Sequence, residues 1–107
     1  MHYDLTDLRL FVAIAEEGNL TRGAARAFLA PSSASHRLQR LEAALGAQLF
    51  QRQARGVALT RAGEALLRNA RQVLAALEQM HANLSPFASG VRGHVSLWAI
   101  SCVQQQS

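Results

Sequence analysis

The sequence is poor in the features that mark secreted, membrane and disulfide-rich proteins. Its 107 residues include a single cysteine, Cys102, which excludes an internal disulfide and fits a reducing cytoplasm. No apolar run approaches the length of a membrane span, so we expect no membrane partner. The first residues carry Asp4 and Asp7 without a basic leader, which argues against a secretory signal. Half of the residues are apolar, so we expect a folded cytoplasmic protein.

Recognisable catalytic and metal-binding patterns are also missing from the sequence. His2, His81, His94 and Cys102 do not have the spacing of metal ligands. There is no carboxylate pair, Cys–His pairing or phosphate-binding loop. We therefore predict that the protein is not an enzyme and has no catalytic residues, no metal and no cofactor.

Lysine is absent as well, so all eleven basic residues are arginines, and they are unevenly distributed. Residues 1–19 carry a net charge of −3, and residues 62–107 carry +1. Between them, residues 20–61 hold seven arginines against Glu42 alone, a net charge of +6. This concentration of positive charge indicates a surface for a polyanion.

The basic region begins with the stretch from Gly18 to Glu42, which predicts two helices joined by a tight turn. Asn19 suits the N-cap of the first helix. The break before Pro31 follows from the restricted backbone of a residue that precedes proline, and Pro31 suits the first position of the second helix. The predicted apolar face of the first helix consists of Leu20, Ala24, Ala25 and Phe28. The predicted buried residues of the second are Ala34, Leu38, Leu41 and Leu45.

The polar side of the second helix combines small hydroxyl groups with arginines, a combination that suits a DNA major groove. The residues on this side are Ser32, Ser33, Ser35, His36, Arg37, Gln39 and Arg40. We interpret Arg37 and Arg40 as phosphate contacts, and we add Thr21 and Arg22 from the preceding helix. The alternative is an ordinary solvated surface, since serine is common at helix starts. Arg26 is as well suited to pairing with an acidic neighbour.

The flanking segments complete a winged architecture. Asp4 can cap a helix that ends at Gly18, with Asp7 in a capping-box position. Residues 51–60 predict a short hairpin with its tip at 53–56, where Arg55 could enter a narrow minor groove. We expect the acidic residues of the first helix to face away from DNA or to pair with arginines.

A long helix capped by Thr60 is predicted to follow, with a heptad-like apolar seam. So small a domain cannot cover this seam, which therefore predicts dimerisation. The predicted dimer residues are Leu66, Ala70, Val73, Leu77, Met80 and Leu84. Ser85–Pro86 predicts an end or a kink of the helix, and residues 94–100 resemble a strand.

The segments LRLFVAIAEEGNLTRGAARAFLAPSSASHRLQRLEAALGAQLFQR and RGVALTRAGEALL resemble the N-terminal DNA-binding domain of the LysR-type transcriptional regulators. The resemblance covers about residues 4–89. It implies a bacterial regulator that binds double-stranded DNA, dimerises through linker helices and often forms tetramers in its full-length members. It also implies a C-terminal effector-sensing domain, of which residues 90–107 resemble only the first strand, so we expect no small-molecule effector for this chain.

The resemblance also bears on individual positions. Where the family's turn usually has Ser-Gln-Pro-Ala-Val-Ser-Arg, this chain has APSSASH at residues 30–36. Pro31 therefore replaces a base-contacting glutamine and His36 replaces an arginine, whereas Ser35 matches the family serine. Arg52 and Arg55 match the arginines that lead into the wing and lie on it.

The sequence thus predicts a mainly α protein with a winged helix-turn-helix domain at 4–61 and a linker or dimerisation helix at 62–89. Residues 90–107 are expected to be the truncated start of an effector domain or a disordered tail. The predicted function is sequence-specific regulation of transcription as a homodimer on an inverted repeat, close to the nucleoid. The alternative is a truncated interaction protein that heterodimerises with a full-length regulator and modulates it.

Overall fold

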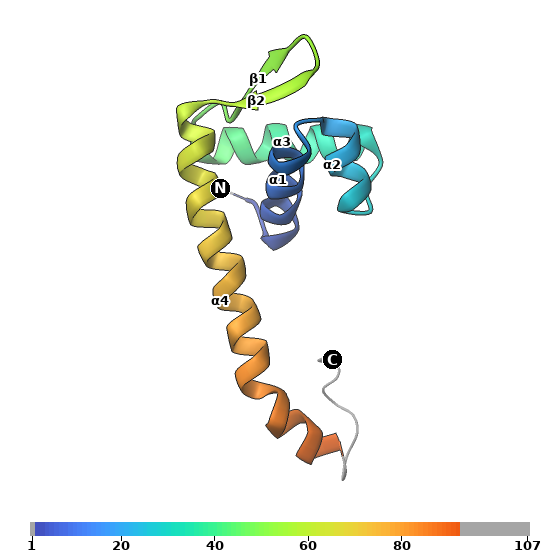
Figure 1. The fold of residues 1–107 in the computed structure, drawn as a ribbon, viewed down its shortest axis with the longest axis vertical. Helices are drawn as coiled ribbons and strands as arrows, with labels where there is room; N and C mark the ends of the chain where they lie inside the picture. Colours follow the sequence, from blue (N-terminus) through green and yellow to red (C-terminus); the bar gives the residue numbers. More distant parts are fainter. Residues whose placement is uncertain (1, 93–107) are drawn as a thin grey trace. The chain divides into compact units, whose positions relative to one another are not determined.

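The computed structural model describes residues 2–92, which form four helices and a two-stranded hairpin (Figure 1). In chain order these elements are α1 Leu5–Glu17, α2 Leu20–Arg26, α3 Pro31–Leu45, β1 Phe50–Gln53, β2 Gly56–Leu59 and α4 Arg61–Arg92. They confirm the predicted mainly α fold, with a winged helix-turn-helix followed by a long helix. No helix among the described residues is long and apolar enough to cross a membrane. The predicted strand at 94–100 lies outside the described residues.

The helix ends follow the capping residues that the sequence provides. Asp4 caps α1 in a reciprocal capping box with Asp7, and Gly18 closes the helix in the left-handed conformation. Asn19 caps α2 by accepting a hydrogen bond from the backbone N–H of Arg22 at 2.9 Å. Thr60 begins α4 in the same way, because its Oγ1 accepts from the N–H of Gly63 at 3.0 Å. These local signals were therefore sufficient to predict where α1, α2 and α4 begin.

One core holds the first three helices and the hairpin together, and it lies within the compact unit that ends at Leu74. Its members are Leu10, Phe11, Ile14, Ala24, Ala34, Leu41, Leu49 and Phe50. The rings of Phe11 and Phe50 pack with their centroids 5.3 Å apart, joining α1 to the start of the wing. The first turns of α4 contribute Ala62, Leu66 and Leu67 to the edge of this core.

The turn between α2 and α3 differs from the prediction. The side chain of Phe28 does not share the buried face of α2 but is 95% exposed, and Ala25 is exposed as well. The reason is that α2 ends at Arg26, and Phe28 then adopts a left-handed conformation with φ of 60°. This backbone reversal takes Phe28 out of the helical periodicity, and Leu29 packs against the core instead.

The predicted end of the long helix at Ser85–Pro86 is also wrong, because α4 continues through Pro86 to Arg92. A proline inside a helix removes one backbone hydrogen bond and crowds the preceding turn, but it does not cancel the helical preference of the residues on both sides. The alternative of a kink at this position stays a prediction.

The wing is fixed to the rest of the domain through its second strand. The two strands are antiparallel and pair Phe50 with Leu59 and Gln53 with Gly56. The N–H of Val57 donates to the carbonyl oxygen of Gly18 at 3.0 Å. Gly56 lies so close to the same carbonyl that a Cβ atom there would collide with it. The wing therefore lies directly beside the turn that leads from α1 into α2.

A buried carboxylate joins α1 to α3. Asp7 is 1% exposed and is the only buried charged residue among those described. Its Oδ1 accepts from Arg37 Nη1 at 2.9 Å, and its Oδ2 accepts from Arg40 Nη2 at 3.2 Å. Burial raises the pKa of Asp7, but the hydrogen bonds from Arg37, from the Asp4 backbone and from Arg40 outweigh burial and leave the pKa below its ordinary value of 3.8.

This arrangement predicts a loss of stability in acid. Because its pKa is lower in the folded than in the unfolded state, Asp7 contributes stability that is fully present above about pH 5 and is lost as the pH falls through the folded pKa. Urea unfolding between pH 6 and pH 2.5 should therefore show a smaller fall in the free energy of unfolding for Asp7→Asn than for the wild type. Parallel pH dependences of the two proteins would contradict this account.

The wing contact predicts an unequal response to alanine at two glycines. Gly56 has φ of +119° and no space for a Cβ atom, so Gly56→Ala should lower the free energy of unfolding by about 2–3 kcal/mol. Gly46 is the matched control, since it has φ of +69° but open space around it, and Gly46→Ala should cost about 1 kcal/mol. Denaturant unfolding measures both values, and equal losses would show that the contact with Gly18 is unimportant.

Candidate nucleic-acid interface

The N-terminal half of α3 presents a polar surface. Ser32, Ser33, His36 and Gln39 are exposed, and Ser35 is half-buried. Pro31 occupies the first turn, as predicted, and it too is exposed. The N-cap residue is Ala30, which provides no side-chain hydrogen bond. The first N–H groups of α3 thus lack a capping side chain, and such groups together with the helix dipole favour an anion such as phosphate.

Arg37 and Arg40 lie on the side of α3 that faces the start of α1. Both were predicted as phosphate contacts, and the structure places both on Asp7, with Arg37 Nη1 also 3.7 Å from Asp4 Oδ1. Their side chains remain 30% and 43% exposed. Each guanidinium carries five N–H donors, so a single contact with Asp7 leaves others for a second partner. The two arginines therefore have a structural role that the sequence did not reveal.

The wing and α2 supply a second group of basic side chains. Arg52 lies on β1 and Arg55 at the tip of the hairpin, and both are exposed, as are Thr21 and Arg22 in the first turn of α2. Within residues 2–92, none of these three arginines forms an ion pair. Because Gly56 packs against Gly18 and lies close to Asn19, the wing tip is held near the start of α2. The residues of the wing and of α2 that were predicted to contact DNA therefore lie close together.

Acidic residues near the end of α1 occupy a different pair of arginines. Arg26 lies 3.0 Å from Glu16 and 3.4 Å from Glu17, and Arg71 of α4 lies 3.0 Å from Glu16. Hydrogen bonds from Arg71 and then Arg26 lower the pKa of Glu16. This confirms that α1 pairs its acidic residues with arginines, and it leaves Arg22, Arg52 and Arg55 without an acidic partner in the described chain.

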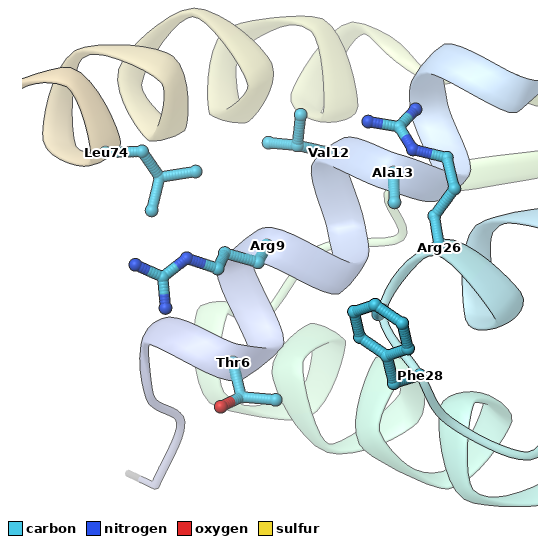
Figure 2. Close-up of a pocket in the computed structure, with 8 residues that line it drawn as sticks. Thr6, Arg9, Val12, Ala13, Arg26, Phe28 and Leu74 are labelled. Atoms are coloured by element: carbon cyan, nitrogen blue, oxygen red, sulfur yellow. The ribbon is translucent and has the colours of Figure 1, made fainter. Parts of the chain in front are cut away.

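A hollow of about 450 Å³ lies between α1, the α2–α3 turn and α4 (Figure 2). Its lining residues are Thr6, Arg9, Val12, Ala13, Arg26, Ala27, Phe28 and Leu74. Of the large apolar side chains in the described chain, Phe28 is the most exposed. Sequence periodicity assigned Phe28 to the core, so this surface was missed. The only signal in the sequence for an exposed Phe28 was its position, as a non-glycine residue, in the turn before Pro31.

The predicted dimer residues divide into two groups. Ala70 is 1% exposed and Leu66 packs against the core of the domain, so both are covered by their own chain. Val73, Met80 and Leu84 are 46%, 47% and 53% exposed, and Leu77 is half-buried. Phe87, one turn beyond Leu84, is 69% exposed. The apolar surface that no other described residue covers therefore begins at Val73.

Comparison with known proteins gives a consistent result. The family model described as "Bacterial regulatory helix-turn-helix protein, lysR family" matches residues 5–64. The chain is 37% identical over 94 residues to the HTH-type transcriptional regulator TfdT of Cupriavidus pinatubonensis, covering 88% of this chain and 41% of TfdT. It is also 37% identical over 94 residues to the regulator BudR of Klebsiella aerogenes, covering 88% of this chain and 66% of BudR. The chain thus spans less than two thirds of the length of either relative.

Solved structures agree with this assignment. The DNA-binding domain of CbnR in complex with DNA superimposes with a TM-score of 0.74 at 34% identity, covering 80% of this chain and 99% of that one. The BenM DNA-binding domain bound to catB site 1 DNA gives a TM-score of 0.76 at 34% identity, covering 81% and 97%. The named relatives are transcriptional regulators and not enzymes. With its helix-turn-helix, wing and long helix matched in both sequence and structure, the chain belongs to the LysR family of bacterial transcriptional regulators and contains their DNA-binding domain.

Proposed function

We propose that this chain binds an inverted-repeat DNA site as a homodimer, with α3 in the major groove and the wing on the adjacent minor groove. The observation that carries the proposal is the uncapped, exposed start of α3, which offers free N–H groups and the side chains of Ser32, Ser33 and His36. Recognition helices of helix-turn-helix proteins lie in the major groove, where their N-terminal residues contact base edges. Such a regulator works on chromosomal DNA, and so in the cytoplasm.

The phosphate contacts come from side chains around α3. Thr21, Arg22, Arg52 and Arg55 are exposed, and the three arginines lack ion-pair partners within the described chain. Arginines in this condition can neutralise phosphates and release counterions without first breaking an internal pair. Arg37 and Arg40 contribute through the donors that Asp7 leaves unused. Pro31 sets the start of the helix and contacts the groove only through its ring, since it has no N–H to donate.

The homodimer is supported by the apolar surface of α4. Val73, Leu77, Met80, Leu84 and Phe87 follow one another at spacings of four, three, four and three residues, the pattern of a coiled-coil seam. Four of these side chains are between 46% and 69% exposed. Two copies joined through this seam would be related by a two-fold axis. The two α3 helices of the dimer would then each meet one half-site, and the two half-sites would have opposite orientations.

Selection of DNA from a random pool tests the proposed base recognition. The enriched sequences should be inverted repeats whose half-sites lie about one helical turn, or a multiple of it, apart. His36→Ala and Ser35→Ala should each change the ranking of half-sites, by about tenfold in relative affinity at one or two positions. Gln72→Ala, an exposed polar change on α4, is the control and should leave the ranking intact. An unchanged ranking for both α3 variants would exclude these residues from base recognition.

Sedimentation analysis tests the seam. Leu84→Glu places a charge in the proposed dimer contact and should weaken self-association by about 100-fold or more. Gln79→Glu adds the same charge to an exposed polar position of the same helix and should leave the dimer intact. A dimer that survives Leu84→Glu contradicts the proposed interface. A wild-type chain that is monomeric, and that binds DNA only after mixing with a full-length regulator, would favour the heterodimerising alternative.

A further inference from the structure

We infer that Asp7 is a positioning residue for DNA recognition, whose buried carboxylate fixes the orientation of α3 and holds the Arg37 and Arg40 guanidinium groups beside the residues that contact bases. The inference rests on the proposal that α3 contacts base edges. Asp7 itself does not touch DNA, because it is 1% exposed.

The carboxylate is held rigidly from the side of α1. Asp7 occupies the N3 position of the α1 capping box, in which its N–H donates to Asp4 Oδ1 and its Oδ2 accepts from the N–H of Asp4, both at 3.0 Å. The reciprocal hydrogen bonds of a capping box restrain the side chain at N3. Asp7 therefore offers α3 a fixed point and not a flexible surface charge.

The same carboxylate holds α3 at two positions one turn apart. Arg37 binds Oδ1 at 2.9 Å and Arg40 binds Oδ2 at 3.2 Å, so each oxygen has its own arginine. Two contacts on successive turns oppose rotation of α3 about its axis, which a single contact would allow. The buried residues Ala34 and Leu41 are small or flexible aliphatic side chains, and apolar packing alone specifies such an orientation less sharply.

The held arginines lie next to the base-contacting residues. On a helix, residues four apart are neighbours, so Arg37 lies one turn from Ser33, and Arg40 one turn from His36. Both arginines are still partly exposed and can use their other donors on phosphate. A rotation of α3 that moved these arginines off Asp7 would therefore also displace the neighbouring side chains in the groove. Asp7 also offsets one of the two positive charges, which limits attraction to DNA of any sequence.

The test compares Asp7→Asn with Glu16→Gln. Both changes remove one carboxylate charge from α1, and both carboxylates bind two arginines, but Glu16 binds Arg26 and Arg71 and does not touch α3. The measurement is the affinity of each folded protein for the selected site and for unrelated DNA, at a series of salt concentrations. The ratio of the two affinities is the readout, since a general loss of folded protein lowers both equally.

We expect Glu16→Gln to leave this ratio at its wild-type value, because the added positive charge strengthens binding to both DNAs alike. Asp7→Asn should lower the ratio about tenfold, since misplaced side chains lose base contacts while phosphate attraction remains. A fall of roughly threefold or more relative to Glu16→Gln supports the inference, and a smaller fall overturns it.

A second pair of variants keeps the test decisive if Asp7→Asn does not fold. Asp7→Asn with Arg37→Met removes the buried carboxylate together with the more buried of its two arginines, and the Arg40 side chain that loses its partner is 43% exposed to solvent. Its control is Glu16→Gln with Arg71→Met, and the same threshold on the affinity ratio applies. Failure of the proposed function is distinguishable, because then the wild-type chain itself would not discriminate between the two DNAs.

Discussion

The ion pairing of Asp7 with Arg37 and Arg40 is the interaction on which the arrangement of the domain depends. A carboxylate that is 1% exposed is costly unless it is paired and hydrogen-bonded, and here a backbone N–H and two guanidinium groups donate to its two oxygens. The same side chain closes the start of α1, so a single residue couples a local helix cap to the placement of α3. In a small domain whose core contains many alanines and leucines, such a polar contact specifies orientation that packing leaves loose.

The acidic residues of α1, Asp7 among them, divide the arginines into paired and unpaired groups. Arg26 and Arg71 neutralise Glu16 and Glu17, and Arg37 and Arg40 share Asp7. Arg22, Arg52 and Arg55 lack ion pairs within residues 2–92 and belong to the helix-turn-helix and the wing. The wing is brought to the start of α2 by the close contact of Gly56 with Gly18. A domain with one acidic helix and many arginines thus uses some of them for its own assembly and leaves others without an ion pair among residues 2–92.

Much of the fold was predictable from local sequence because its signals act over three or four residues. Asp4, Asn19, Pro31 and Thr60 mark the helix starts through hydrogen bonds or steric limits that need no tertiary context. The hairpin tip and the charge distribution were predictable for the same reason. Periodicity failed at Phe28, where a left-handed residue ended the helical pattern. The helix-breaking tendency of proline misled at Pro86, where the helix continued.

By itself, therefore, the sequence determined the order of the elements, their capping residues, the basic character of the middle of the chain and the family. Only the tertiary structure decided which arginines are free, because Asp7 and Arg37 lie 30 residues apart and no local rule joins them. It also divided the α4 seam, covering Ala70 with the domain core and leaving Val73, Met80 and Leu84 exposed. The physical reason is the same in both cases: a charge or an apolar side chain acquires its role from the partner that covers it.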